Sequence, residues 1–167
     1  EKDSKKVEPF LNKIIEVTMP YDITSNKQQK TNESIILEKG SKAVGGHTIK
    51  NIKAPPDAGA TKDQWVEVKH TDFKKPLILT KPVADAFIKM RVAWVAGVDM
   101  TQVGKLIPSS AFRKTGDESK GNHDIGSALD LITPKGNSDK KRAFIEYVIK
   151  LGWSAGFRGF GFPQTTP

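Results

Sequence analysis

The hydrophobic pattern of the second half of the chain predicts two amphipathic helices. In the first, apolar side chains recur at intervals of three and four residues, the period of one helix face: Val83, Phe87, Met90 and Trp94. Thr80 is a favourable N-cap, so we expect this helix over 80–96, ended by Gly97. A second helix is expected from Ser138, with its apolar face ending at Leu151 and Gly152 as the residue that terminates it.

Shorter apolar stretches, separated by Gly, Pro and polar residues, predict strands. We expect several strands within 35–79, one over 103–107 that Pro108 ends, and one over 125–132. At the N-terminus, apolar residues at helical spacing predict a short helix over 1–15, followed by a polar loop or linker over 20–34. Strands and two helices without repeated β–α–β units favour an α+β fold.

Composition narrows the class of protein. With 167 residues, 37% of them hydrophobic, the chain can form about one domain with its own core. No apolar run approaches the ~20 residues that a transmembrane helix needs, so no membrane span is predicted. The absence of cysteine excludes disulfides, thiolate–zinc sites and a thiol nucleophile. The net charge of +8 favours anionic partners, but no long basic run supports a nucleic-acid partner.

The segment HDIGSALD, residues 123–130, contains the most informative polar residues. His123 follows a polar loop, and Asp130 shares a strand face with the small Ala128, which leaves room beside the carboxylate. A histidine and an aspartate that face one pocket could be two of the three protein ligands of a catalytic zinc ion. From the spacing alone, a hydrogen-bonded His–Asp pair is the competing interpretation.

Other candidate residues carry weaker signals. His47 and His70 are interpreted as surface histidines, and the loop carboxylates Asp117, Glu118 and Asp124 as solvated charges, so no general base is identified. The serines lack the GxSxG context of a hydrolase nucleophile. The glycine-rich tail lacks the spacing of a phosphate-binding loop.

The segment HDIGSALD resembles HxxGxAxD, the ligand motif of zinc peptidases that cleave D-alanyl peptides in peptidoglycan. This family includes D-alanyl-D-alanine carboxypeptidases and dipeptidases, L-alanyl-D-glutamate endopeptidases and many phage endolysins. The order of segments also resembles the family: a helix, a strand that leads into PSSAFR at 108–113, a loop, the motif, a helix and a Gly-rich turn at 159–162. The resemblance covers about residues 77–167.

The resemblance implies roles for three residues. His123 and Asp130 would be zinc ligands, and Arg113 would hold substrate and stabilise charge on the attacked carbonyl. Gly121 stands where the family has a serine that is not a ligand. The family's third ligand is a histidine after the Gly-rich turn, and no histidine follows His123. Two explanations compete: the chain is truncated before that strand, or it kept the fold and lost the site. A third ligand from elsewhere, such as His47 or His70, is a less favoured alternative.

The resemblance also implies a fold and a place of action. We expect a small antiparallel sheet with helices packed on it, of the Hedgehog/DD-peptidase type, over 76–167, without its last strand. Residues 1–75, which the resemblance does not cover, are expected to form an N-terminal extension with a short helix and strands, which would be an assembly arm in a non-catalytic protein. The implied function is zinc-dependent cleavage of D-alanyl or L-alanyl peptide bonds in peptidoglycan, outside the cell or on a virion. The alternative is a non-catalytic component of a phage tail, baseplate or injection machine that keeps the peptidase fold.

Overall fold

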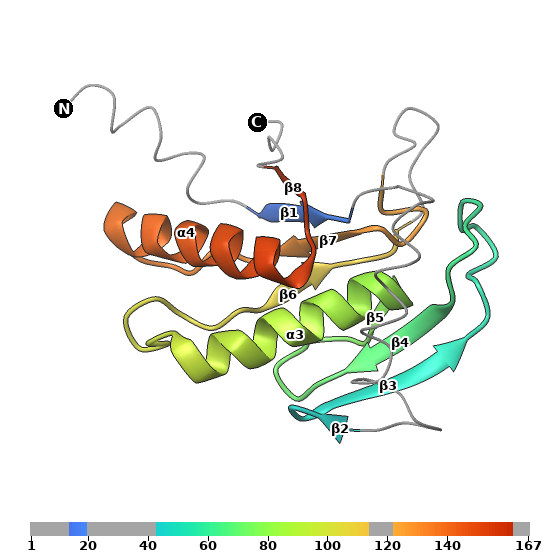
Figure 1. Cartoon of the computed structure of the whole chain (residues 1–167), viewed down its shortest axis with the longest axis horizontal. Helices are drawn as coiled ribbons and strands as arrows, with labels where there is room; N and C mark the ends of the chain where they lie inside the picture. Colours follow the sequence, from blue (N-terminus) through green and yellow to red (C-terminus); the bar gives the residue numbers. More distant parts are fainter. Residues whose placement is uncertain (1–13, 20–42, 114–121, 162–167) are drawn as a thin grey trace.

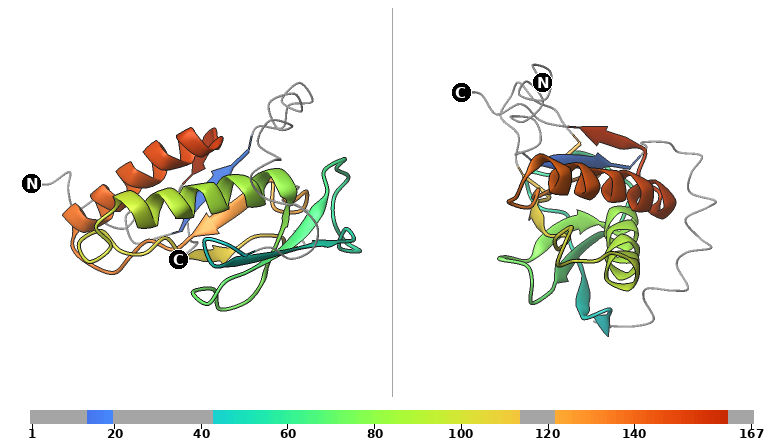
Figure 2. Two further views of the ribbon diagram at one scale, coloured as in Figure 1. Left: turned by 60° about the horizontal axis from the view of Figure 1, so that its bottom comes forward. Right: turned by 90° about the vertical axis from the view of Figure 1, so that its left-hand side faces the viewer.

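The computed structural model describes residues 14–19, 43–113 and 122–161, which form two helices and two antiparallel sheets of four strands each (Figure 1). This arrangement confirms the expected α+β class. The two helices lie side by side (Figure 2), and their buried residues share one hydrophobic core with buried residues of both sheets. None of the helices in these ranges is long and apolar enough to cross a membrane.

Helix α3 (Lys81–Gly97) matches the prediction closely, with Thr80 as the N-cap and Pro82 in the first turn. Helix α4 (Ser138–Ala155) begins as expected, although Asn137 is the capping residue and accepts a hydrogen bond from the backbone N–H of Lys140. The predicted end at Gly152 is wrong: Gly156, with φ of 118°, caps the helix one turn later.

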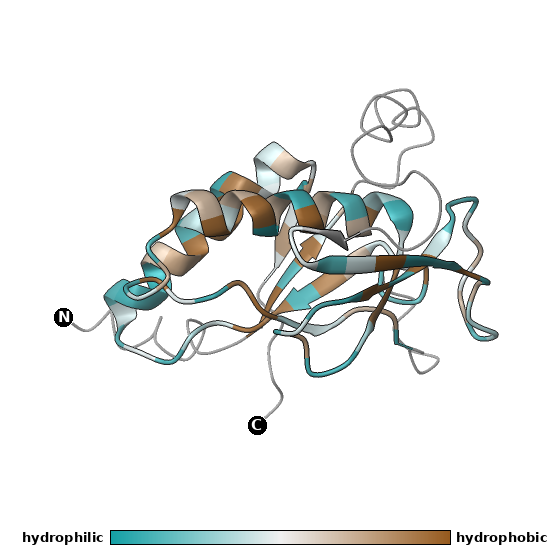
Figure 3. Ribbon diagram, turned by 90° about the horizontal axis from the view of Figure 1, so that it is seen from below, coloured by the Kyte–Doolittle hydropathy of each residue, from teal (hydrophilic) through white to brown (hydrophobic). Residues whose placement is uncertain are grey.

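Gly152 has another use inside α4. A Cβ atom at this position would lie 2.8 Å from Cε1 of Phe160, so glycine lets the helix approach the following strand closely. Hydrophobic positions recur along both helices (Figure 3). Trp94 of α3 and Phe144 of α4 meet edge-to-face, with ring centroids 5.1 Å apart, in the core that the helices share.

The first sheet joins strands that are distant in sequence. Its order is β6 (Pro108–Ser110), β7 (Ala128–Leu131), β1 (Ile15–Thr18) and β8 (Gly159–Gly161). The strand expected over 103–107 is wrong, because pairing with β7 begins at Pro108, the residue expected to end it. The strand expected over 125–132 is real but shorter, since residues 122–126 form turns.

The N-terminal strand was missed by the sequence pattern. Ile15 begins β1 instead of ending a helix, and Ile15 and Val17 are fully buried. The rest of the expected helix, residues 1–13, and the polar stretch 20–34 lie outside the described residues.

The second sheet has the order β2 (Ala43–Val44), β3 (His47–Ile52), β4 (Trp65–Lys69) and β5 (Leu77–Thr80). These strands match the strands expected within 35–79, except that β5 extends to Thr80 and that residues 35–42 lie outside the described residues. The two sheets adjoin where the N–H of Phe112, just beyond β6, donates to the carbonyl of Ile78 in β5.

Both sheets cross the division that we expected between residues 75 and 76. Strand β4, before the division, pairs with β5 after it, and β1 pairs with both β7 and β8. In the described residues, therefore, the two parts share their sheets and their hydrophobic core.

Candidate metal centre

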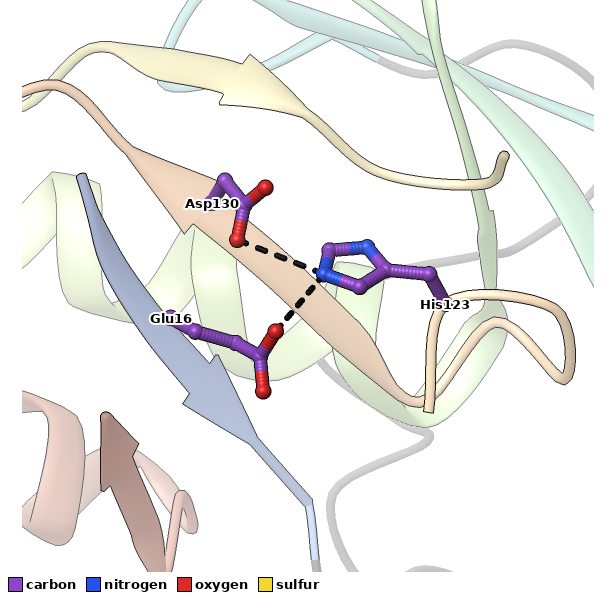
Figure 4. Close-up of side chains that lie close together, drawn as sticks. All are labelled: Glu16, His123 and Asp130. Atoms are coloured by element: carbon purple, nitrogen blue, oxygen red, sulfur yellow. Dashed lines mark hydrogen bonds and ion pairs between the residues drawn. The ribbon is translucent and has the colours of Figure 1, made fainter. Parts of the chain in front are cut away.

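Three side chains from separate segments meet on one face of the first sheet. Glu16 of β1 lies directly opposite Asp130 of β7 in the antiparallel register, so both carboxylates project from the same face. His123 reaches over them from the turn at residues 122–126 (Figure 4). Its Nε2 lies 2.9 Å from Oε2 of Glu16 and 3.3 Å from Oδ1 of Asp130.

The backbone fixes which nitrogen of His123 faces the carboxylates. Nδ1 lies 2.7 Å from the carbonyl oxygen of Ala111, which can only accept, so Nδ1 carries a proton. Nε2 then faces two anionic groups. If Nε2 carried no proton, its lone pair would face only carboxylate oxygens, which are acceptors. Nε2 is therefore stabilised by a cation, either its own proton or a metal ion bound between it and the carboxylates.

The pKa values follow from this charge arrangement. Burial alone would lower the pKa of His123, but hydrogen bonds to Asp130, Glu16 and the Ala111 carbonyl outweigh it and raise the pKa to about 9. Burial alone would raise the pKa of Asp130, whereas its contacts with His123, Ser110 and Arg113 hold that pKa below its usual value. In the metal-free protein at neutral pH, a protonated imidazole therefore bridges two carboxylates.

Asp130 is held from its other side by two neighbours. Oδ2 accepts a hydrogen bond of 2.9 Å from the hydroxyl of Ser110 and lies 3.3 Å from a guanidinium nitrogen of Arg113. Oδ1 is buried and, apart from its ion-pair contact with His123, accepts no hydrogen bond from the described residues. The oxygen that faces the centre is thus the one free to contact a cation.

The donor atoms of Glu16, His123 and Asp130 all lie within 4.8 Å of one another, so this group could hold a metal ion. One imidazole nitrogen and two carboxylate oxygens are ligands of Zn²⁺, and oxygen-rich sets also suit Mn²⁺. The side chains of His123 and Asp130 are 4% and 2% exposed, whereas that of Glu16 is 29% exposed. The centre is therefore enclosed on its histidine and aspartate side and opens to solvent beside Glu16.

The structure brings together the three residues that the sequence singled out. His123 and Asp130 are in contact, and Arg113 contacts Asp130 while its own side chain remains 51% exposed. Of the candidate carboxylates, Asp124 is half-buried in the turn that carries His123. Asp117 and Glu118 lie outside the described residues.

Glu16 was missed by the sequence analysis. A signal for its strand exists, although not for its partners: in Ile15–Thr18 apolar and polar residues alternate, which is the pattern of a strand with one polar face. The helical spacing upstream of this segment concealed the alternation.

The other two histidines lie elsewhere: His47 begins β3 of the second sheet, and His70 directly follows β4. The expectation that His47 lies on the surface is wrong, because it is 2% exposed and its ring centroid lies 4.5 Å from that of His70. Both rings contact Phe73, so these histidines belong to an aromatic cluster and not to the candidate centre.

Comparisons with protein-family models, with curated proteins and with solved structures found no match to this chain.

Proposed function

We propose that this protein is a zinc-dependent peptidase that cleaves D-alanyl or L-alanyl peptide bonds in bacterial peptidoglycan. The observation that carries the proposal is the meeting of Glu16 with His123 and Asp130, which supplies a third donor to the pair. A catalytic zinc site typically has three protein ligands and an open position. The exposure of Glu16 provides a route from solvent to such a position.

The choice of zinc and of the peptidase class rests on the resemblance of HDIGSALD to the family motif. The donor set is compatible with it, since imidazole and carboxylate both ligate zinc. The fold that we propose is accordingly of the Hedgehog/DD-peptidase type. Here Glu16, from an N-terminal strand, takes the place of the third ligand that the family supplies after its Gly-rich turn.

Different residues of the chain would have different roles in such a site. When bound, zinc would polarise the scissile carbonyl and make a coordinated water more acidic. Arg113 would orient a substrate carbonyl or carboxylate, because its guanidinium is anchored to Asp130 yet half exposed. Ser110 is not a nucleophile in this scheme, since its hydroxyl is bound to Asp130 and not to His123.

The proposed substrate also suits the charge of the chain. A net charge of +8 favours adsorption to the anionic bacterial wall, outside the cell or from a virion. The proposed partners are therefore peptidoglycan peptides and, for a virion-associated protein, tail or baseplate proteins.

A zinc titration of the full chain tests the proposal. The wild-type protein should bind one Zn²⁺, and His123→Ala should abolish tight binding. The matched control is His70→Ala, which removes a histidine from the aromatic cluster and should bind zinc like the wild type. Zinc-loaded protein should then release new amino groups from purified peptidoglycan. Failure of the wild type to bind zinc, or equal binding by His123→Ala, would contradict the proposal.

One observation favours a second candidate, a non-catalytic tail or baseplate component. The imidazole of His123 contacts both carboxylates directly, so the group can balance its charges with a proton alone. In that case His123→Ala would lower the stability of the fold, zinc would not raise the melting temperature, and purified peptidoglycan would remain uncut.

A further inference from the structure

The turn that carries His123 lies against the second sheet. The hydroxyl of Thr80, at the end of β5, donates a buried hydrogen bond of 2.8 Å to the carbonyl of Gly126. The backbone N–H of Thr80 approaches the same carbonyl at 3.3 Å. The end of the turn is therefore held by β5, a strand that contributes no ligand to the candidate centre.

The hydroxyl of Thr80 does not make the helix-capping hydrogen bond that its position in the sequence predicts. Thr80 is the N-cap residue of α3, and the side chain of an N-cap threonine ordinarily accepts a hydrogen bond from the first turn of its helix. In this protein Thr80 makes no such cap bond. Its hydroxyl is directed instead to Gly126, 46 residues further along the chain.

The contact between the turn and the second sheet is too close for any side chain. Gly126 has φ of +68°, and a Cβ there would lie 2.7 Å from the ring of Trp65 and 2.9 Å from Cγ2 of Thr80. A second hydrogen bond, 2.8 Å from the N–H of Gly59 to the carbonyl of Asp124, holds the turn from the β3–β4 connection. The backbone on both sides of Ile125 is thus tied to the second sheet and its loop.

We propose that Thr80 is a positioning residue of the candidate metal centre, acting through the turn that presents His123. The imidazole is oriented at one end by the Ala111 carbonyl, and at the other end by the backbone of its turn. Thr80 fixes that backbone, and through it the distance of Nε2 from Glu16 and Asp130. Groups that orient a ligand without touching the metal commonly change metal affinity by about 10–100-fold when they are removed.

This inference rests on the proposed zinc site, and its test separates the two. Zinc affinity is measured for the full chain with Thr80→Val, which keeps the shape but removes the hydroxyl, and with Thr80→Ser, which restores it. We expect Thr80→Val to bind zinc about tenfold more weakly and Thr80→Ser to bind like the wild type. Val66→Ala, on the buried face of the neighbouring strand, is the control for lost stability and should keep wild-type affinity.

Hydrogen exchange in the metal-free protein gives an independent readout. The amides of Gly126 and Ser127 close the turn through bonds to the carbonyls of His123 and Asn122. They should exchange faster in Thr80→Val, while the β3–β4 amides keep their wild-type rates.

Unchanged zinc affinity in Thr80→Val, or an equal loss in Val66→Ala, would overturn the positioning role. If the wild type bound no zinc, the peptidase proposal would fail first. Exchange rates would then still decide whether Thr80 orders the turn, and unchanged rates at Gly126 and Ser127 would overturn that as well.

Discussion

At the scale of single residues, the candidate centre depends on where two carboxylates stand relative to one imidazole. Asp130 is enclosed and held by Ser110 and Arg113, so its orientation is set before any ion arrives. Glu16 is the exposed member, and the described residues hold its side chain only through His123. A metal ion would therefore have to order the side chain of Glu16 more than that of Asp130.

Replacing Glu16 tests whether its carboxylate is a ligand. Glu16→Gln keeps the size of the side chain but removes its charge, and we expect zinc affinity to fall by at least about 100-fold, beyond the effect of outer-shell changes. Glu67→Gln is the matched control, because Glu67 is also a strand residue with a similarly exposed side chain, 25% against 29%. Competition with a chromogenic chelator measures both affinities. Unchanged zinc binding with lost peptide cleavage would instead assign Glu16 to proton transfer.

A second charged group lies away from the candidate centre. Asp72 accepts a hydrogen bond of 2.9 Å from Arg91, which is 6% exposed and also bonds the carbonyl of Leu106. Burial alone would raise the pKa of Asp72, but the hydrogen bond from Arg91 and the charges of Lys105 and Arg91 outweigh it and lower the pKa. The ionised carboxylate is thus favoured in the folded protein.

This pair predicts how stability depends on pH. Because the pKa of Asp72 is lower in the folded than in the unfolded protein, its contribution is complete above the unfolded value of about 4 and is lost as the pH falls through the folded value. Asp72→Asn should lower the free energy of unfolding by about 2 kcal/mol at pH 7, since it leaves the buried guanidinium of Arg91 without its anionic partner. The difference in the free energy of unfolding between the wild type and Asp72→Asn should become smaller toward pH 3. Urea unfolding at both pH values measures it, with the exposed Glu146→Gln as control; a difference independent of pH would contradict the prediction.

At the scale of elements, local pattern located the helices better than the strands. Four apolar residues on one face of α3 fixed that helix to within one residue at each end. The strand near Pro108 was predicted several residues too early. A strand of three residues is defined by its pairing with β7 and has too few residues for a hydrophobic pattern of its own. His123 and Asp130 could be found because they share a motif. Glu16 could not, because 107 residues separate it from His123 and only the pairing of β1 with β7 joins them.

Two glycines test whether a local turn is set by distant contacts. Gly126→Ala should destabilise the protein by about 2–3 kcal/mol, because the new methyl group meets Trp65 and Thr80 and the residue must keep a positive φ. At Gly97, the last residue of α3, a Cβ would meet nothing within 4 Å. Gly97→Ala should therefore leave stability unchanged or raise it by up to about 1 kcal/mol. Thermal unfolding of both variants measures the contrast, and similar melting temperatures would refute it.

At the scale of the whole molecule, the strands before residue 76 complete both sheets. Strand β1 lies between β7 and β8, and its residues Ile15 and Val17 are fully buried in the core shared with α3 and α4. Strand β4 lies between β3 and β5 and buries Val66 and Val68 in the same core. A chain reduced to residues 76–167 would keep both helices but expose the surfaces that these strands cover.

We therefore expect the full chain to unfold in one cooperative transition, and the fragment 76–167 not to fold alone. Urea unfolding followed by tryptophan fluorescence and by far-ultraviolet circular dichroism should give coincident curves, because Trp65 of β4 and Trp94 of α3 lie on opposite sides of the expected division within one folded unit. Two separate transitions, or a folded fragment, would support an N-terminal extension that is independent of residues 76–167. The result also bears on the candidate metal centre, because the fragment 76–167 lacks Glu16, one of its three donors. The fragment also lacks Trp65 and the rest of β4, so Thr80 would remain in a strand β5 without its pairing partner.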